Sequence, residues 1–226
     1  MKPWAKYKLR LYAMAATAAA LLLLFQLTLE RRRAYPHYIT ILSEHHAERL
    51  TLWQTREIIF LGDSHIQFLD TAKIRVDALN LGIGGLTTQV LLEHLPTYEI
   101  APSQLVVIGT GINDLAHFGR GQTQTNLRAL TAYMNSRGST WSLLEIMPVN
   151  EVLTKIKNDD IRALNALLAD LCIAPCTLIR SHGAVATIDG NLHPDYDRGD
   201  GLHLNQAGYQ ALIDQIKSQF AEQPMR

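Results

Sequence analysis

The chain has 226 residues, and its 21 Lys and Arg balance its 21 Asp and Glu, so the formal net charge is zero. This balance excludes the strongly basic surface that is typical of nucleic-acid-binding proteins, and we expect no nucleic-acid partner. The length fits one domain of ordinary size with an appendage, and such a domain buries a substantial core.

The appendage is at the N-terminus. The stretch from Leu11 to Leu29 contains no charged residue, and about 19 residues at ~1.5 Å each span roughly 28 Å, enough to cross a bilayer core. Residues 1–10 form a basic flank before it, and three arginines follow it at 31–33. We therefore predict a single-pass transmembrane anchor over 11–29. A cleaved signal peptide is the alternative, disfavoured because no small-x-small motif ends the stretch.

The basic residues around this stretch also bear on its orientation. Positive charge is in slight excess on the N-terminal side, which favours the N-terminus inside the cell. In a bacterial cell the remaining chain would then lie in the periplasm, anchored to the inner (cytoplasmic) membrane. Residues 30–56 are predicted to be a juxtamembrane connector. Apolar residues recur there at helical spacing, which predicts an amphipathic helix that lies on the domain or, alternatively, on the membrane surface; they include Ile39, Leu42, Leu50 and Trp53.

From residue 57 onward, short apolar runs alternate with helical patterns. The runs predict strands buried on both faces, and they occupy residues 58–61, 76–81, 105–108, 141–146 and 176–179. Helices are predicted over residues 65–73, 87–95, 122–137, 158–171 and 205–220. This alternation predicts an α/β domain over 57–226 with a parallel sheet covered on both sides. Cys172 and Cys176 at the last helix-to-strand junction are either a small disulfide ring or two buried thiols.

Three polar segments follow the first three predicted strands. Ligands bind beyond the carboxyl ends of strands in such sheets, so we expect the segments to form one site. Ser64 lies where the first strand turns into a helix, where it is either a nucleophile or an N-cap. The segments are Gly62-Asp63-Ser64-His65, Gly84-Gly85 and Gly111-Ile112-Asn113-Asp114.

A fourth segment, Asp200-Gly201-Leu202-His203, precedes the last predicted helix. Its spacing lets one loop carry an imidazole and the carboxylate that orients it, although a surface loop with unrelated charges has the same pattern. Gly85 and Asn113 are candidate donors to an oxyanion, through a backbone N–H and a side-chain amide. The alternatives are that Gly84-Gly85 is only a tight turn and Asn113-Asp114 only a helix cap. His182 and His193 fit no metal-ligand spacing, so we expect no metal site.

Together, the four segments resemble the SGNH (GDSL-type) hydrolase superfamily over about residues 57–220. The resemblance implies a three-layer α/β/α, flavodoxin-like fold with, here, a five-stranded parallel sheet. It implies ester chemistry without a metal or other cofactor. Carried over, the catalytic residues are Ser64, Asp200 and His203, and the oxyanion hole is formed by the N–H groups of Ser64 and Gly85 and the Asn113 amide.

Two residues depart from the family pattern. His65 stands where many members have Leu, and either contacts the substrate or packs under the sheet. Leu86 stands where an Asp often follows the second Gly, which removes a charge from the pocket rim.

We predict a serine esterase that cleaves small esters, such as acetyl groups, on carbohydrate. The partner would then be a small ester or an acylated glycan. The alternatives are an O-acyltransferase that moves the acyl group to a glycan, a lysophospholipase or thioesterase, and a non-catalytic glycan-binding module on the same fold.

Overall fold

The structure is a computed structural model that describes residues 3–222. In its first helix, the side chains of residues 3–15 and 27–36 lie outside the described set. The chain divides into two compact units, of which the first ends at Glu44 and the second begins at His45. Each unit is described by itself.

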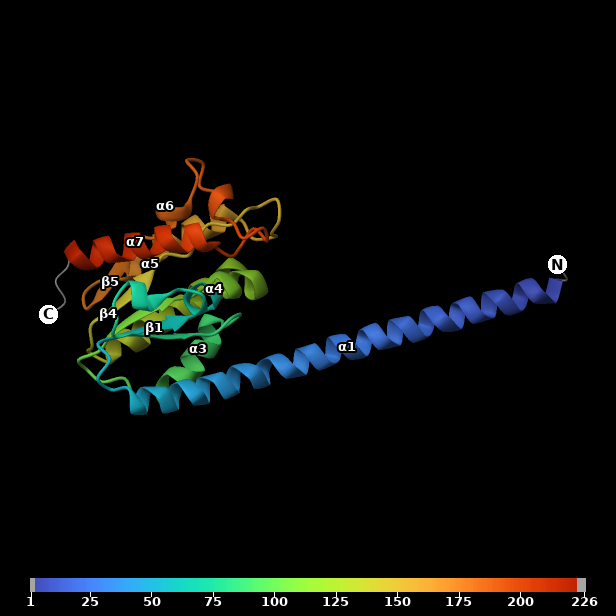
Figure 1. Cartoon of the computed structure of the whole chain (residues 1–226), viewed down its shortest axis with the longest axis horizontal. Helices are drawn as coiled ribbons and strands as arrows, with labels where there is room; N and C mark the ends of the chain where they lie inside the picture. Colours follow the sequence, from blue (N-terminus) through green and yellow to red (C-terminus); the bar gives the residue numbers. More distant parts are fainter. Residues whose placement is uncertain (1–2, 223–226) are drawn as a thin grey trace. The chain divides into compact units, whose positions relative to one another are not determined.

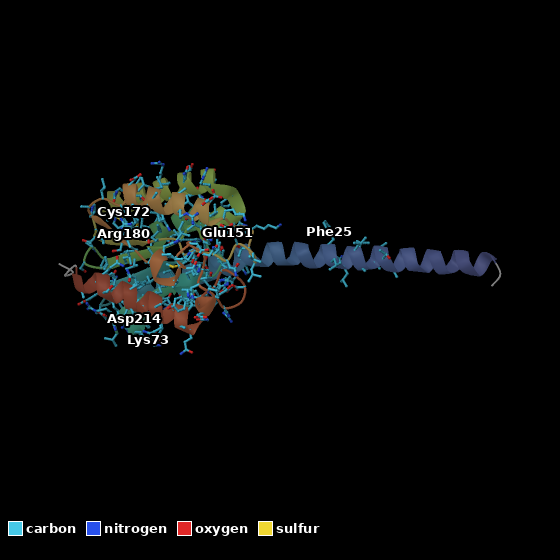
Figure 2. The ribbon with its side chains drawn as sticks, turned by 90° about the horizontal axis from the view of Figure 1, so that it is seen from above. Phe25, Lys73, Glu151, Cys172, Arg180 and Asp214 are labelled. Carbon is cyan, nitrogen blue, oxygen red and sulfur yellow. A yellow bond between two sulfur atoms is a disulfide. The ribbon has the colours of Figure 1, made fainter. Side chains whose placement is uncertain are left out.

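The first unit consists of helix α1 (Pro3–Leu52), whose last residues belong to the second unit. Leu21 to Phe25 expose 58–62% of their surface, and Figure 2 shows Phe25 projecting from the helix. Among the residues that the structure describes, no helix is long and apolar enough to span a bilayer. The predicted anchor, Leu11 to Leu29, falls outside the described side chains at residues 11–15 and 27–29.

The second unit is built on a sheet of five parallel strands (Figure 1). The strands are β1 (Ile58–Gly62), β2 (Ala78–Gly82), β3 (Leu105–Gly109), β4 (Trp141–Leu144) and β5 (Cys176–Ile179). Their spatial order is β2-β1-β3-β4-β5, the flavodoxin-like order. The predicted α/β class and five-stranded parallel sheet are thus confirmed. In this register Gly62 pairs with Gly82 and with Gly109, so β1, β2 and β3 end together.

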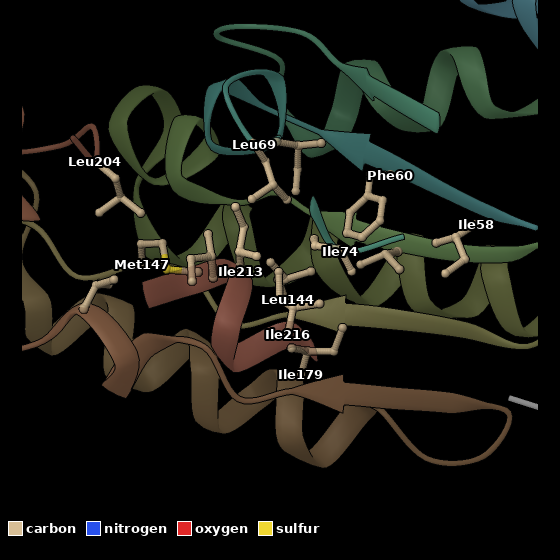
Figure 3. Packing of buried hydrophobic residues seen from close by; sticks show 14 of the residues in the cluster. Ile58, Phe60, Leu69, Ile74, Leu144, Met147, Ile179, Leu204, Ile213 and Ile216 are labelled. Carbon is tan, nitrogen blue, oxygen red and sulfur yellow. The ribbon is translucent and has the colours of Figure 1, made fainter. Parts of the chain in front are cut away.

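Helices cover both faces of this sheet. On one face, Ile213 and Ile216 of α7 (Gln206–Glu222) pack in one cluster with Phe60, Leu144 and Ile179 of the strands (Figure 3). On the other, Trp141 donates its indole N–H to Asn135 of α4 (Ile112–Ser136) at 3.0 Å. The remaining elements are α2 (Ser64–Gln67), α3 (Thr88–His94), α5 (Asn158–Leu171), α6 (His182–Val185), η1 (Thr71–Lys73), η2 (Leu95–Thr97) and η3 (Pro194–Tyr196).

Several predicted elements differ from those observed, among them strand β2, which begins at Ala78 rather than at residue 76. Helix α4 begins at Ile112 rather than at residue 122, because Gly111 adopts φ +117° and turns the chain directly into the helix; Gly119 then interrupts it. The helix predicted over 65–73 is two short pieces, α2 and η1. Strand β4 ends at Leu144 and not at residue 146, because the backbone of Ile146 is bound by a side chain instead of a neighbouring strand. The Ile146 N–H donates to Asn165 Oδ1, and Asn165 Nδ2 donates to Ile146 O.

The two cysteines form a disulfide that connects the end of α5 to the start of β5. Their Cα atoms are 5.0 Å apart, within the usual range for a bridged pair. Of the two alternatives left open by the sequence, the structure thus has the disulfide ring.

Candidate active site

Ser64 lies on a tight turn between β1 and α2. Gly62, with φ +148°, is required there because a Cβ atom would collide with the carbonyl oxygen of Gly109. Asp63 caps the helix: its Oδ1 accepts the N–H of His65 at 2.9 Å. Its own N–H donates to Gly109 O at 3.1 Å, which holds the turn against β3. Ser64 therefore begins a helix, where its N–H has no intrahelical partner, and its residue surface is only 6% exposed.

His203 joins Ser64 to Asp200. Its Nε2 lies 3.0 Å from Ser64 Oγ, and its Nδ1 lies 2.6 Å from Asp200 Oδ2. A carboxylate accepts only, so Nδ1 carries the proton and Nε2 accepts the Ser64 hydroxyl. The other carboxylate oxygen accepts the N–H groups of Leu202 and His203, at 3.0 and 2.8 Å. This arrangement can remove the proton of a serine hydroxyl and stabilise the imidazolium that results.

The electrostatics of Asp200 suit that task. Partial burial raises the pKa of this carboxyl, but the hydrogen bonds from the backbone and the imidazole of His203 more than offset it, and the pKa is lowered to about 2. Asp200 is therefore ionised at neutral pH. The pair lies at the surface, with 49% of the Asp200 side chain and 25% of the His203 side chain exposed.

The loop that carries this pair is held by hydrogen bonds to its backbone groups. Asp197 Oδ1 accepts the N–H groups of Gly199 and Gly201, at 2.7 and 3.0 Å. Gly201 O accepts the N–H of Asn150 at 2.8 Å. Gly201 has φ +76° and lies so close to Leu153 that a side chain does not fit. In the fourth segment, Gly201 is therefore required by the shape of the loop, while Asp200 is required by the chemistry.

The oxyanion candidates lie together at the ends of β2 and β3. The ideal Cβ position of Gly84 is 4.0 Å from Ser64 Cβ, and Gly85 follows with φ +76°. Asn113 is on the first turn of α4, where its Nδ2 donates to Leu86 O at 3.1 Å. An amide nitrogen has two hydrogens, so this bond orients the side chain and leaves one hydrogen for a ligand.

Asp114, which the sequence suggested only as a cap, fixes that helical turn. It is fully buried. Its Oδ2 accepts the N–H of Thr88 at 2.6 Å, and its Oδ1 accepts the side-chain amide of Asn126 at 2.7 Å. The bond to Thr88 fastens the start of α4 to the start of α3, and the bond to Asn126 joins the two parts of α4 across the interruption at Gly119. Its place beside Asn113 in the third segment was the available signal.

Two further neighbours were not found from the sequence. Phe68, the C-cap of α2, contacts the His203 ring edge-on, with ring centroids 6.0 Å apart. The guanidinium of Arg198 lies 5.8 Å from the Phe68 ring. His65, in contrast, faces the interior, with Nε2 3.0 Å from Leu202 O and Nδ1 3.5 Å from Asp63 Oδ1. Among the residues described, no group of three or more His, Cys, Asp or Glu side chains could hold a metal ion.

A family match covers most of the second unit of the chain. The GDSL-like Lipase/Acylhydrolase family matches residues 61–211 of the chain. The chain belongs to this family. It is therefore an ester hydrolase of the GDSL type, and the four polar segments of the sequence all lie within the matched range.

Solved structures share the fold at low sequence identity. A GDSL-like lipase from Bacteroides thetaiotaomicron is 20% identical, with a TM-score of 0.64 over 80% of this chain and 97% of that one. A lipase/acylhydrolase from Enterococcus faecalis is 21% identical, with a TM-score of 0.63 over 74% and 96%. An acetyl xylan esterase is 18% identical, with a TM-score of 0.59 over 72% and 98%. No curated protein matches the chain.

Proposed function

We propose that the chain is a serine esterase that removes small acyl groups, such as acetyl, from carbohydrate. One observation carries the chemistry: the unbroken line of hydrogen bonds from Ser64 Oγ through His203 to Asp200, at 3.0 and 2.6 Å. A nucleophile, a base and a carboxylate that orients the base are the requirements of acyl transfer through a covalent intermediate.

In the proposed mechanism, His203 Nε2 takes the Ser64 proton as Oγ attacks the ester carbonyl. The negative charge on the carbonyl oxygen is held by the N–H groups of Ser64 and Gly85 and by the Asn113 amide. The intermediate collapses, the C–O bond to the alcohol breaks, and His203 returns its proton to the departing alcohol. Water then loses a proton to His203, attacks the acyl-Ser64 carbonyl, and releases the acid and the free serine.

A polar cleft beside the catalytic loop supports a hydrophilic alcohol part of the ester. The small cavity beside Asp63 and His65, of about 20 Å³, has room for a water molecule and is not lined by Ser64, Gly85 or Asn113. A cleft of about 600 Å³ begins at Asn150, whose N–H binds Gly201 O. It is lined by Asn150, Asn158, Asp159, Arg162, Asp189 and Asn191.

Amide and carboxylate side chains of this kind bind hydroxyl groups, which supports a carbohydrate as the alcohol part of the ester. The acetyl xylan esterase among the structural neighbours acts on a substrate of that class by its name. The other two neighbours are named as lipases, so hydrolysis of a lipid ester is the competing outcome of the test.

The proposal includes a tether to the inner membrane through Leu11 to Leu29, with the domain in the periplasm. Its support is the uncharged stretch with basic residues on both sides and the disulfide between Cys172 and Cys176, a bond that persists in oxidising compartments. Alkaline extraction of membranes from cells that express the full-length chain tests the tether. Release of the chain into the supernatant would contradict it.

Hydrolysis of p-nitrophenyl acetate and p-nitrophenyl octanoate by the full-length chain, with Ser64→Ala as the control, tests the chemistry. We expect acetate turnover that disappears in the variant, and release of acetate from an acetylated xylan. Preference for octanoate would indicate that the substrate is a lipid ester or a thioester and not a carbohydrate ester. Turnover that requires an added glycan acceptor would make the protein a transferase. Full activity of Ser64→Ala would overturn the mechanism.

A further inference from the structure

A second Asp–His pair lies beneath the candidate active site. His65 directly follows Ser64, and its side chain is 8% exposed, while that of Asp63 is 3% exposed. The His65 backbone N–H donates to Asp63 Oδ1 at 2.9 Å, and its ring Nδ1 is 3.5 Å from the same oxygen. The imidazole is therefore held at one end by the turn that carries Ser64.

The other end of the ring reaches the loop of Asp200 and His203. His65 Nε2 lies 3.0 Å from the carbonyl oxygen of Leu202, a residue 137 positions away in the sequence. A carbonyl oxygen only accepts, so Nε2 carries a hydrogen and donates it. Leu202 lies between the two members of the exposed pair, and its own N–H is bound to Asp200 Oδ1. The contact thus holds the peptide immediately before His203.

The charges around His65 favour its protonated form. Burial by itself lowers the pKa of His65, but the hydrogen bond and negative charge of Asp63, the Leu202 carbonyl and the charge of Asp200 together raise it above the ordinary value. The His203 ring centroid is 6.0 Å away. As an imidazolium, His65 carries hydrogen on both ring nitrogens: Nε2 donates to the Leu202 carbonyl, and the positive ring forms an ion pair with Asp63 through Nδ1.

Two other titratable groups face this pair from neighbouring elements. Glu145, at the end of β4, lines the small cavity together with Asp63 and His65. Tyr209, on α7, has a buried hydroxyl without a hydrogen-bond partner among the described residues. Burial and then the negative charge of Asp63 raise the pKa of Tyr209, so it stays neutral. These groups leave Asp63 as the carboxylate that makes the direct contact with His65.

We propose that His65 is a positioning residue: its Nε2–H···O bond to Leu202 ties the loop of Asp200 and His203 to the turn of Ser64, and so sets the approach of His203 to the serine. The proposal rests on the proposed esterase mechanism. The exposed loop and the nucleophile turn are distant in sequence, and reaction rates are sensitive to displacements of about 1 Å between reacting groups. A leucine at this position would fill space without making the bond.

The test compares His65→Leu with His65→Gln in the full-length chain, with p-nitrophenyl acetate as substrate. The control variants are His45→Leu and His45→Gln, because His45 is an exposed histidine of the same unit. Active sites are counted by titration with an organophosphonate, so that kcat refers to folded, reactive enzyme. We expect His65→Leu to lose about 10- to 100-fold in kcat, with KM within about twofold. Because the Gln amide can donate to Leu202 O, most of the loss should be rescued in His65→Gln.

The pH profile separates positioning from stability. In His65→Leu, the acid limb of the kcat/KM profile should move to higher pH, because a positive charge near the base has been removed. A residue that only fills space would lower the melting temperature or the fraction of active sites. It would leave kcat per active site within twofold of the wild type and the profile in place, and this result would overturn the proposal.

A measurement on the unmodified chain covers the case in which the variants do not fold. Long-range ¹H–¹⁵N spectra report which imidazole nitrogens carry hydrogen, and we expect a protonated His65 Nε2 that exchanges slowly at pH 7. An unprotonated Nε2 would sink the proposal, since no bond to Leu202 O could then form. This readout does not depend on turnover, so failure of the esterase mechanism and failure of the His65 tie are distinguishable.

Discussion

Two Asp–His pairs lie close to Ser64, and they differ in burial and in what the Nε2 atom of the imidazole contacts. In the outer pair, 49% of Asp200 and 25% of His203 are exposed, and His203 Nε2 meets a hydroxyl. In the inner pair, Asp63 and His65 are 3% and 8% exposed, and His65 Nε2 meets a carbonyl oxygen. A hydroxyl can give up a proton, while a carbonyl can only accept a hydrogen bond. The same two residue types thus serve proton transfer in the outer pair, while in the inner pair they connect the turn of Ser64 to the loop of His203.

The largest effect is expected for Asp200→Asn, in the outer pair. The Asn side-chain oxygen still accepts the N–H groups of Leu202 and His203, so the loop should keep its shape. The imidazole, however, loses the carboxylate that fixes its tautomer, and kcat should fall on the order of 10⁴-fold. Steady-state kinetics and thermal unfolding measure the two effects. A kcat near that of the wild type would remove Asp200 from the mechanism.

A smaller loss is expected at the oxyanion donor that lies outside both pairs. Asn113→Ala removes the side-chain amide, and loss of one such donor lowers kcat by roughly 10²- to 10³-fold. KM should change little, because the donor acts mainly on the charged intermediate. A rise in KM with unchanged kcat would instead make Asn113 a ground-state binding residue.

Asp63→Asn separates the charge of the inner pair from its geometry. The Asn oxygen still caps α2 by accepting the His65 N–H, but the negative charge is lost. Burial then dominates, and the pKa of His65 should fall below its wild-type value. A neutral ring protonated at Nε2 still binds Leu202 O, so kcat at pH 7 should fall less than in His65→Leu. Titration by ¹⁵N spectra follows the pKa, and an unchanged value would show that Asp63 does not control it.

His46 provides the control for a buried histidine without a carboxylate. Burial, and then the charges of Arg49 and His45, lower the pKa of His46 from 6.5 to about 4, and its Nδ1 has no hydrogen-bond partner among the described residues. The unfolded chain binds the proton of this imidazole more tightly than the folded chain does. The contribution of neutral His46 to the free energy of unfolding is therefore complete above pH 6.5 and is lost as the pH falls toward 4. The loss is at most about 3 kcal/mol.

Urea unfolding at pH 7 and pH 4.5, with His46→Leu for comparison, measures this contribution. The wild type should lose more free energy of unfolding between the two pH values than the variant loses. The kcat values at pH 7 should be the same, because His46 lies outside both pairs. An equal pH dependence in the two proteins would show that another group titrates in this range.

Much of the fold follows from patterns that are local in the sequence. Apolar runs of four to six residues predicted all five strands, because strands of a parallel sheet covered by helices are rich in apolar side chains. The two edge strands, β2 and β5, are only partly buried and include Asn80 and Thr177. Helix α5 occupies the predicted residues 158–171. The sequence did not predict the start of α4, because Gly111 and Gly119 are typical of loops. The helix is stabilised there by hydrogen bonds that depend on the fold, such as the bond from the Thr88 N–H to Asp114 and the bond from Asn126 to Asp114.

For the site, local sequence patterns specify that a serine, two glycines and an asparagine stand at the ends of strands and that an Asp-x-x-His precedes the last helix. Tertiary packing brings these residues together. It places His203 3.0 Å from Ser64, turns His65 inward to a carbonyl 137 residues away, and joins Cys172 to Cys176. This division arises because strand and helix periodicity is a property of neighbouring residues. The approach of two loops depends instead on the packing of the whole sheet and its helices.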